Sequence, residues 1–118
     1  MIENRKSFIV GLKSLKLTNN EKSFLKAHKP WGIILFSRNI KSIKQTKTLT
    51  DNIKKIFKDN NYPILIDQEG GRVNRLKDII SFDNLTSEFF GNLYKKEKMK
   101  FDIIYKLFVD KTCHLLKL

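Results

Sequence analysis

Three short apolar runs limit the possible folds of this chain more than any other feature. They occupy residues 8–12, 32–36 and 64–66, and each is too short to form a buried helix. Their hydrophobicity is continuous rather than alternating, which is typical of strands that are covered on both faces, as in parallel sheets. The runs therefore predict three parallel strands.

The segments around these runs have helical spacing. Thr18 precedes Glu21 by three positions, a pattern that predicts a helix start closed by a capping box. Between residues 42 and 58 the apolar residues recur as one stripe among lysines, and residues 86–118 are also expected to be helical, with a break near Gly91. Strands alternating with helices predict an α/β fold.

A charged stretch, DQEGGRVNR, directly follows the third run. It begins with Asp67, which stands at the carboxyl end of a strand, where parallel α/β folds bind their ligands. Gly70 and Gly71 permit a sharp turn or a close approach to a ligand, and Arg72 and Arg75 carry planar donor groups. The pattern fits a clamp for a polyhydroxylated ligand. It equally fits an ion pair of Asp67 with Arg72 or Arg75 that only braces the loop.

Other chemistries fit this sequence poorly. EGGR lacks the Lys-Ser/Thr ending of a phosphate-binding P-loop, and no GxGxxG follows the first apolar run. One cysteine and two distant histidines, His28 and His114, do not have the spacing of metal ligands. The residues therefore predict neither a nucleotide loop of these types nor a metal centre.

The charge of the chain suggests an alternative function. A formal net charge of +12 raises the question of a nucleic acid or another anionic polymer as partner. The lysines are spread along the whole length, however, and helical segments commonly carry lysine on their solvated faces. A small basic binding module is therefore the alternative to an enzyme, and we expect no specific nucleic-acid partner.

Composition favours a folded protein of the cytoplasm. The hydrophobic fraction is 41%, and no apolar run approaches the ~20 residues that would cross a bilayer, so no membrane insertion is expected. The N-terminus lacks the pattern of a secretory signal. The single cysteine, Cys113, excludes an intramolecular disulfide and fits a reducing compartment.

Several motifs match a known family in order and spacing. PILIDQEGGRVNRL, at residues 63–76, resembles the signature of glycoside hydrolase family 3, in particular its bacterial β-N-acetylhexosaminidases, in which a strand ends in D-Q-E-G-G-R-V-x-R. GLKSLKLTNNE, at residues 11–21, is similar to the family's G-L-x-G-x-x-L-T-x-E-E. WGIILFSRNI, at residues 31–40, is similar to its G-G-V-I-L-F-x-R-N, with Trp31 in place of the first glycine.

The resemblance implies a fold and an activity. Members of the family are (β/α)₈ TIM barrels that hydrolyse terminal β-linked N-acetylhexosamine residues by a retaining mechanism, without a metal or an organic cofactor. Their substrates include muropeptides that are recycled from peptidoglycan in the cytoplasm. The resemblance thus implies a carbohydrate partner that contains N-acetylglucosamine. By position, Asp67 and Arg75 match the residues that bind the non-reducing sugar, and Arg72 matches a position to which we assign a loop-bracing role.

The sequence carries only part of the family pattern. A barrel of this kind needs ~250 residues, and neither the S-D-D-like motif with the nucleophile nor the K-H-F-P-G-H-G loop occurs here. We therefore expect residues 1–118 to form about three βα units, the N-terminal portion of a barrel domain truncated at its C-terminus, with no catalytic residue. The isolated chain is expected to be inactive, and its oligomeric state is not predicted.

Overall fold

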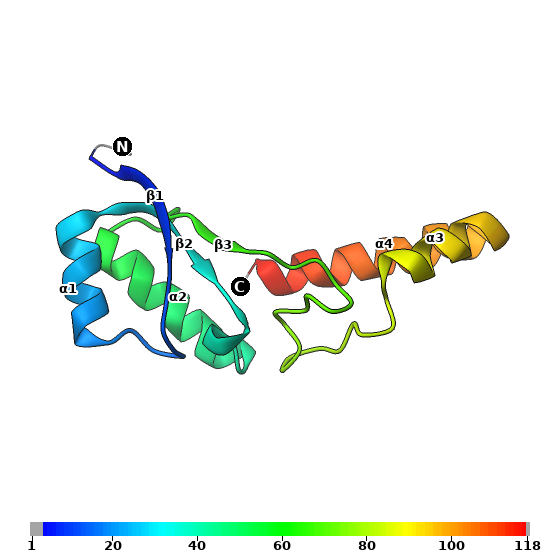
Figure 1. Ribbon diagram of the computed structural model, residues 1–118, viewed down its shortest axis with the longest axis horizontal. Helices are drawn as coiled ribbons and strands as arrows, with labels where there is room; N and C mark the ends of the chain where they lie inside the picture. The colour runs from blue at the N-terminus through cyan, green and yellow to red at the C-terminus, as the bar shows by residue number, and fades with distance from the viewer. Residues whose placement is uncertain (1–3, 118) are drawn as a thin grey trace.

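The computed structural model describes residues 4–117 and contains one parallel sheet (Figure 1). Its strands lie in the order β1 (Lys6–Gly11), β2 (Pro30–Leu35) and β3 (Ile64–Ile66). Helices α1 (Asn19–His28) and α2 (Ile43–Phe57) connect them. The predicted α/β class, with three parallel strands alternating with helices, is confirmed.

The sheet buries one face against α1 and α2. Val10, Ile33 and Ile64 stand side by side in the strand register and belong to the apolar contacts of this core. The buried members of this core come from the strands, from the helices and from the loops between them: Leu12, Leu25, Ile33, Leu35, Ile40, Leu49, Ile53, Tyr62, Leu76 and Leu115. Burial of these side chains supplies the main driving force for folding.

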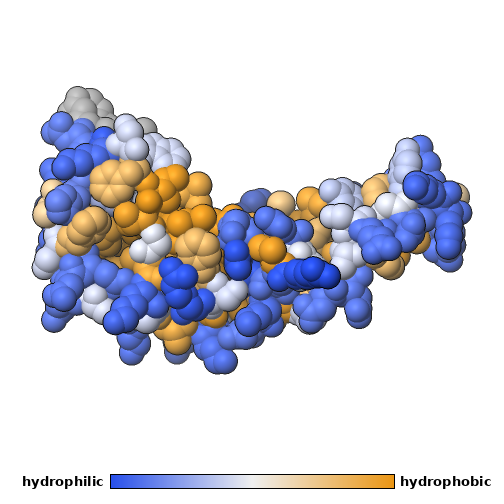
Figure 2. All heavy atoms as spheres, in the orientation of Figure 1, coloured by the Kyte–Doolittle hydropathy of each residue, from blue (hydrophilic) through white to orange (hydrophobic). Residues whose placement is uncertain are grey.

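The opposite face of the sheet is not covered within the described residues. Ile9 in the middle of β1 is 46% exposed, and Ile34 and Leu65, neighbours in the register, are only half-buried. Figure 2 shows apolar side chains gathered over the three strands, whereas hydrophilic side chains dominate the right-hand part of the molecule. The expectation that both faces are covered is therefore wrong for this part of the chain.

The ends of α1 and α2 have well-defined caps. Thr18 and Glu21 form the predicted capping box, in which the Thr18 hydroxyl accepts from the Glu21 N–H and the Glu21 carboxylate accepts from the Thr18 N–H. Ser42 caps α2 through its hydroxyl, which accepts from the Gln45 N–H. Both helices end at a lysine in the left-handed conformation, Lys29 with φ 46° and Lys58 with φ 51°.

The C-terminal segment is a hairpin of two helices, α3 (Ser87–Lys96) and α4 (Lys98–Leu116). The break lies at Glu97, with φ −145° and ψ 68°, and not near Gly91, which lies inside α3. Aromatic side chains on both helices pack against each other and fold α4 back along α3: Phe90, Tyr94, Phe101, Tyr105 and Phe108. This packing requires the chain to turn after α3, which the periodicity of the sequence did not reveal.

The molecule is elongated. The hairpin projects from the sheet body, and the extents along the principal axes are 54 × 27 × 20 Å (Figure 1). Only the end of α4 reaches the core, where Leu115 is buried. None of the helices between residues 4 and 117 combines the length and the apolar character that crossing a bilayer requires.

Candidate functional site

Asp67 and Arg75 form an ion pair at the carboxyl end of β3. The Arg75 Nε donates to Asp67 Oδ1 and its Nη2 donates to Asp67 Oδ2, both at 2.7 Å. Two parallel hydrogen bonds fix the planar guanidinium and the carboxylate relative to each other. The structure thus brings together two of the three site residues that the sequence predicts.

This ion pair shifts the pKa values of both side chains. Hydrogen bonding from the Arg75 guanidinium holds the pKa of the Asp67 carboxyl below its usual value, and the same contact raises the pKa of Arg75. The side chains of Arg75 and Asp67 keep 26% and 35% of their surface exposed. A carboxylate has about four lone-pair sites, so Asp67 can accept further hydrogen bonds from a ligand.

The loop after Asp67 turns back sharply at its two glycines. Gly70 has φ 82° and Gly71 has φ 53°, a region that side chains with a Cβ atom rarely adopt. The Val73 N–H donates to the Gly70 carbonyl at 3.2 Å, and the Val73 carbonyl accepts from the Gly70 N–H at 3.2 Å. The predicted sharp turn is confirmed, and it returns the chain so that Arg75 faces Asp67.

Two amide side chains hold this loop in place, and the sequence analysis did not single them out. Gln68 donates to Asn74 Oδ1 at 3.0 Å and accepts from the Arg75 backbone N–H at 2.8 Å. Asn74 is 5% exposed and donates to the Ile80 carbonyl at 3.0 Å. Both lie inside the DQEGGRVNR motif. Polar residues that follow an apolar strand are the sequence signal that could have identified them.

Arg72 lies outside these contacts. Its side chain is exposed and makes no hydrogen bond or ion pair with any residue between 4 and 117. Within the described residues, the bracing that we assign to Arg72 is made instead by Gln68, Asn74 and Arg75.

Two side chains from the loop after β2, those of Phe36 and Arg38, lie beside the ion pair. The guanidinium carbon of Arg75 is 5.4 Å from the centroid of the Phe36 ring, and that of Arg38 is 4.7 Å from the same ring. Arg38 Nε donates to the Leu12 carbonyl at 2.7 Å. The sequence contained the signal for this group, the F-x-R-N pattern, but we assigned it no role.

Asn39 fixes the positions of these loops. It is fully buried, and its amide donates to the carbonyls of Leu12 at 3.1 Å and Ser14 at 2.9 Å. Its carbonyl accepts from the Phe36 N–H at 3.0 Å. The site therefore combines a polar clamp with an aromatic ring, and loops from all three strands contribute to it or support it. Such a mixture suits a ring that carries both hydroxyl groups and C–H faces.

The described residues contain no cluster for a metal ion. No group of three or more histidine, cysteine, aspartate or glutamate side chains between residues 4 and 117 is arranged to hold one.

The chain is similar to bacterial β-hexosaminidases. It is 38% identical over 92 residues to the β-hexosaminidase of Psychromonas ingrahamii, a match that covers 78% of this chain and 26% of that protein. Crystal structures of NagZ from Neisseria gonorrhoeae, in complex with zinc ion and in complex with N-trifluoroacetyl-D-glucosamine, have TM-scores of 0.63 and 0.61 at 33% identity. Both comparisons cover 79% of this chain and 27% of the NagZ chain.

The matches to the curated relatives span 18% to 27% of the length of those proteins. No family model matches it. The solved structures share the fold of the described residues and are similar in sequence as well, which supports homology over the matched part.

Proposed function

Because the chain is homologous, over part of their length, to the bacterial β-hexosaminidases of glycoside hydrolase family 3, we propose that it contributes to a subsite for a terminal β-linked N-acetylhexosamine. The observation that carries this proposal is the partly exposed, bidentate Asp67–Arg75 pair at the carboxyl end of a parallel strand. Ligand sites of parallel α/β folds lie at this edge.

We assign distinct roles to the two side chains. Asp67 accepts hydrogen bonds from sugar hydroxyls through the lone pairs that Arg75 leaves free. Arg75 uses two of its five N–H groups on Asp67, so others can donate to the same ligand. The pair orients the carboxylate before the sugar arrives, which reduces the entropy lost on binding.

Hydrolysis by this proposal needs residues beyond this chain. A retaining glycosidase uses a nucleophile and an acid/base group on either side of the scissile bond. We assign neither role to any residue between 1 and 118. We propose that the chain is part of a barrel domain and is inactive alone, and that the complete domain acts on saccharides or muropeptides from peptidoglycan in the cytoplasm. The single cysteine is compatible with that compartment.

Fluorine NMR can test this proposal directly on the 118-residue chain. N-trifluoroacetyl-D-glucosamine, which binds NagZ in a crystal structure, carries a fluorine label on the acetyl group. We expect its signal to broaden when the chain is added and to recover when N-acetylglucosamine competes. Binding through a partial subsite should be weak, with a dissociation constant of about 1 mM or more.

Two aspartate variants separate a specific site from a general effect. Asp67→Asn keeps the size of the side chain but removes the charge, and it should lower the affinity about tenfold or more. Asp110→Asn removes one charge from the exposed surface of α4 and should leave the affinity unchanged. Equal affinity of Asp67→Asn and the parent chain would exclude Asp67 from the sugar subsite.

A further inference from the structure

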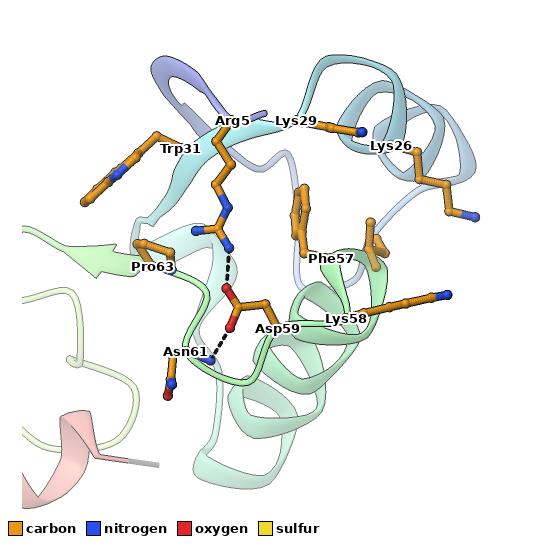
Figure 3. A pocket seen from close by; sticks show the side chains of 10 residues that line it. Arg5, Lys26, Lys29, Trp31, Phe57, Lys58, Asp59, Asn61 and Pro63 are labelled. Carbon is orange, nitrogen blue, oxygen red and sulfur yellow. Dashed lines mark hydrogen bonds and ion pairs between the residues drawn. The ribbon is translucent and has the colours of Figure 1, made fainter. Parts of the chain in front are cut away.

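A basic hollow lies at the edge of the sheet opposite to Asp67. It has a volume of about 590 Å³ and lies where β2 begins, where the chain enters β1 and β3, and where α1 and α2 end (Figure 3). Small-molecule sites in proteins have volumes of this order. The proposed sugar subsite lies at the carboxyl ends of the strands, so this hollow is a separate place on the molecule.

The hollow has an excess of positive charge. Its lining includes Arg5, Lys26, Lys29 and Lys58 but a single carboxylate, that of Asp59. Asp59 already pairs with Arg5 and accepts from the Asn61 backbone N–H at 2.8 Å. Within residues 4–117 no ion pair engages the three lysines. They are available to an anionic ligand.

Two of these lysines occupy positions that favour glycine. Lys29 and Lys58 both have a left-handed backbone, which glycine adopts without steric strain and lysine does not. Attraction of a lysine to the carbonyl end of a helix accounts for a cation near each cap. It does not account for a strained residue at both caps, with both side chains lining one hollow. The presence of lysine at both positions is explained if the two ammonium groups bind the same anionic ligand.

An aromatic side chain forms the other end of the hollow. Trp31 lines it from β2, next to Pro63, and is 41% exposed. In Figure 3 the three lysines lie on the side of α1 and α2, and the indole lies on the far side of Arg5. A flat exposed ring opposite free cations matches a ligand that has a planar ring and a phosphate, because nucleobases stack on tryptophan while phosphates attract lysine.

From this arrangement we propose that the hollow binds a nucleotide, either free or as part of a single-stranded nucleic acid. Lys29 and Lys58 contact the phosphate, and Trp31 stacks on the base. Arg5, held by Asp59, keeps its place between them. The site is independent of the sugar subsite that we propose at Asp67.

Trp31 is the single tryptophan of the chain, so its fluorescence reports on this hollow alone. We expect saturable quenching by adenosine diphosphate, and quenching at least about tenfold weaker by adenosine or by pyrophosphate, which each lack one half of the ligand. A ten-residue oligothymidylate distinguishes the two sources. Tighter binding of the oligonucleotide indicates single-stranded nucleic acid, and equal or weaker binding indicates a free nucleotide.

Glycine substitutions separate binding from folding. The double variant Lys29→Gly, Lys58→Gly removes both ammonium groups and relieves both left-handed caps, so the urea midpoint should stay the same or rise while affinity falls at least about tenfold. The double variant Lys95→Ala, Lys111→Ala removes the same charge from the exposed surfaces of α3 and α4 and should change affinity about twofold or less.

Four results would overturn the proposal. Two concern the variants: equal losses of affinity in the two double variants, or full affinity of the variant that carries both Lys29→Gly and Lys58→Gly. Two concern the ligands: pyrophosphate binding as tight as that of the nucleotide, or no change in Trp31 fluorescence with any probe. Asp67→Asn should leave nucleotide binding intact, because that carboxylate lies at the other edge of the sheet. The two proposed sites can therefore fail independently.

Discussion

A single contact at the residue scale satisfies both interpretations of the charged stretch after β3. The Asp67–Arg75 pair braces the loop, since it joins residues eight positions apart, and it also holds a partly exposed carboxylate in a fixed direction. A ligand clamp and a structural brace are therefore compatible at this place.

Titration of Asp67 can be predicted from this contact. Arg75 lowers the folded-state pKa of Asp67, so the pair stabilises the fold above the unfolded-state pKa of about 3.9. This stabilisation is lost as the pH falls through the folded-state pKa. In Arg75→Ala the carboxyl pKa should return toward its usual value, and stability should depend less on pH below about pH 4. Carbon-13 NMR of the carboxyl groups measures the pKa directly.

Arg72 provides the matched control for this titration. It lies in the same loop, is exposed, and makes no contact with Asp67 among the described residues. Arg72→Ala removes the same charge and should leave the Asp67 pKa where it is. A rise of the pKa in Arg72→Ala as large as that in Arg75→Ala would mean that the general charge of the loop, and not the bidentate contact, controls the carboxyl group.

At the scale of elements, buried Asn39 joins the end of β1 to the loop after β2. Its side chain makes hydrogen bonds to Leu12, Ser14 and Phe36 and has no exposed surface. Asn39→Ala would leave buried carbonyls without a donor, so we expect the free energy of unfolding to fall by about 2–3 kcal/mol. Urea denaturation followed by circular dichroism measures this change.

An asparagine on the surface of α2 serves as the control for Asn39. Asn52→Ala removes the same atoms from an exposed helical position, where alanine has the higher helix propensity, so stability should be unchanged or slightly higher. A loss below about 0.5 kcal/mol in Asn39→Ala would mean that water or a rearranged loop replaces its hydrogen bonds.

The elements show which features the sequence could predict. The strand at Ile64–Ile66 and the capping box of Thr18 were correct because they depend on neighbouring residues. The break at Glu97 was missed because aromatic packing between two helices determines it. In the candidate site, Asp67 and Arg75 came from a motif, whereas the stack of Phe36 on Arg75 depends on strand order, which local patterns do not contain.

At the scale of the whole molecule, the chain is more extended than a compact domain of its length. Its radius of gyration is 17.0 Å, whereas compact chains of this size have about 13–14 Å. The projecting hairpin of α3 and α4 accounts for the difference, and the sheet also leaves one apolar face uncovered (Figure 1). Exposed apolar surface of this kind favours association between chains, and the net charge of +12 opposes it.

These two forces predict that self-association of the chain increases with salt. Between about 0.05 M and about 0.5 M salt the screening length shortens severalfold, which weakens repulsion between chains and leaves apolar attraction intact. Sedimentation velocity should therefore show a larger associated fraction at the higher salt concentration. Ile9→Lys, in the uncovered face, should reduce that fraction strongly. Leu107→Lys adds the same charge to α4, outside the uncovered face of the sheet, and should reduce it less. Association that falls as salt rises would show instead that contacts between opposite charges hold the chains together.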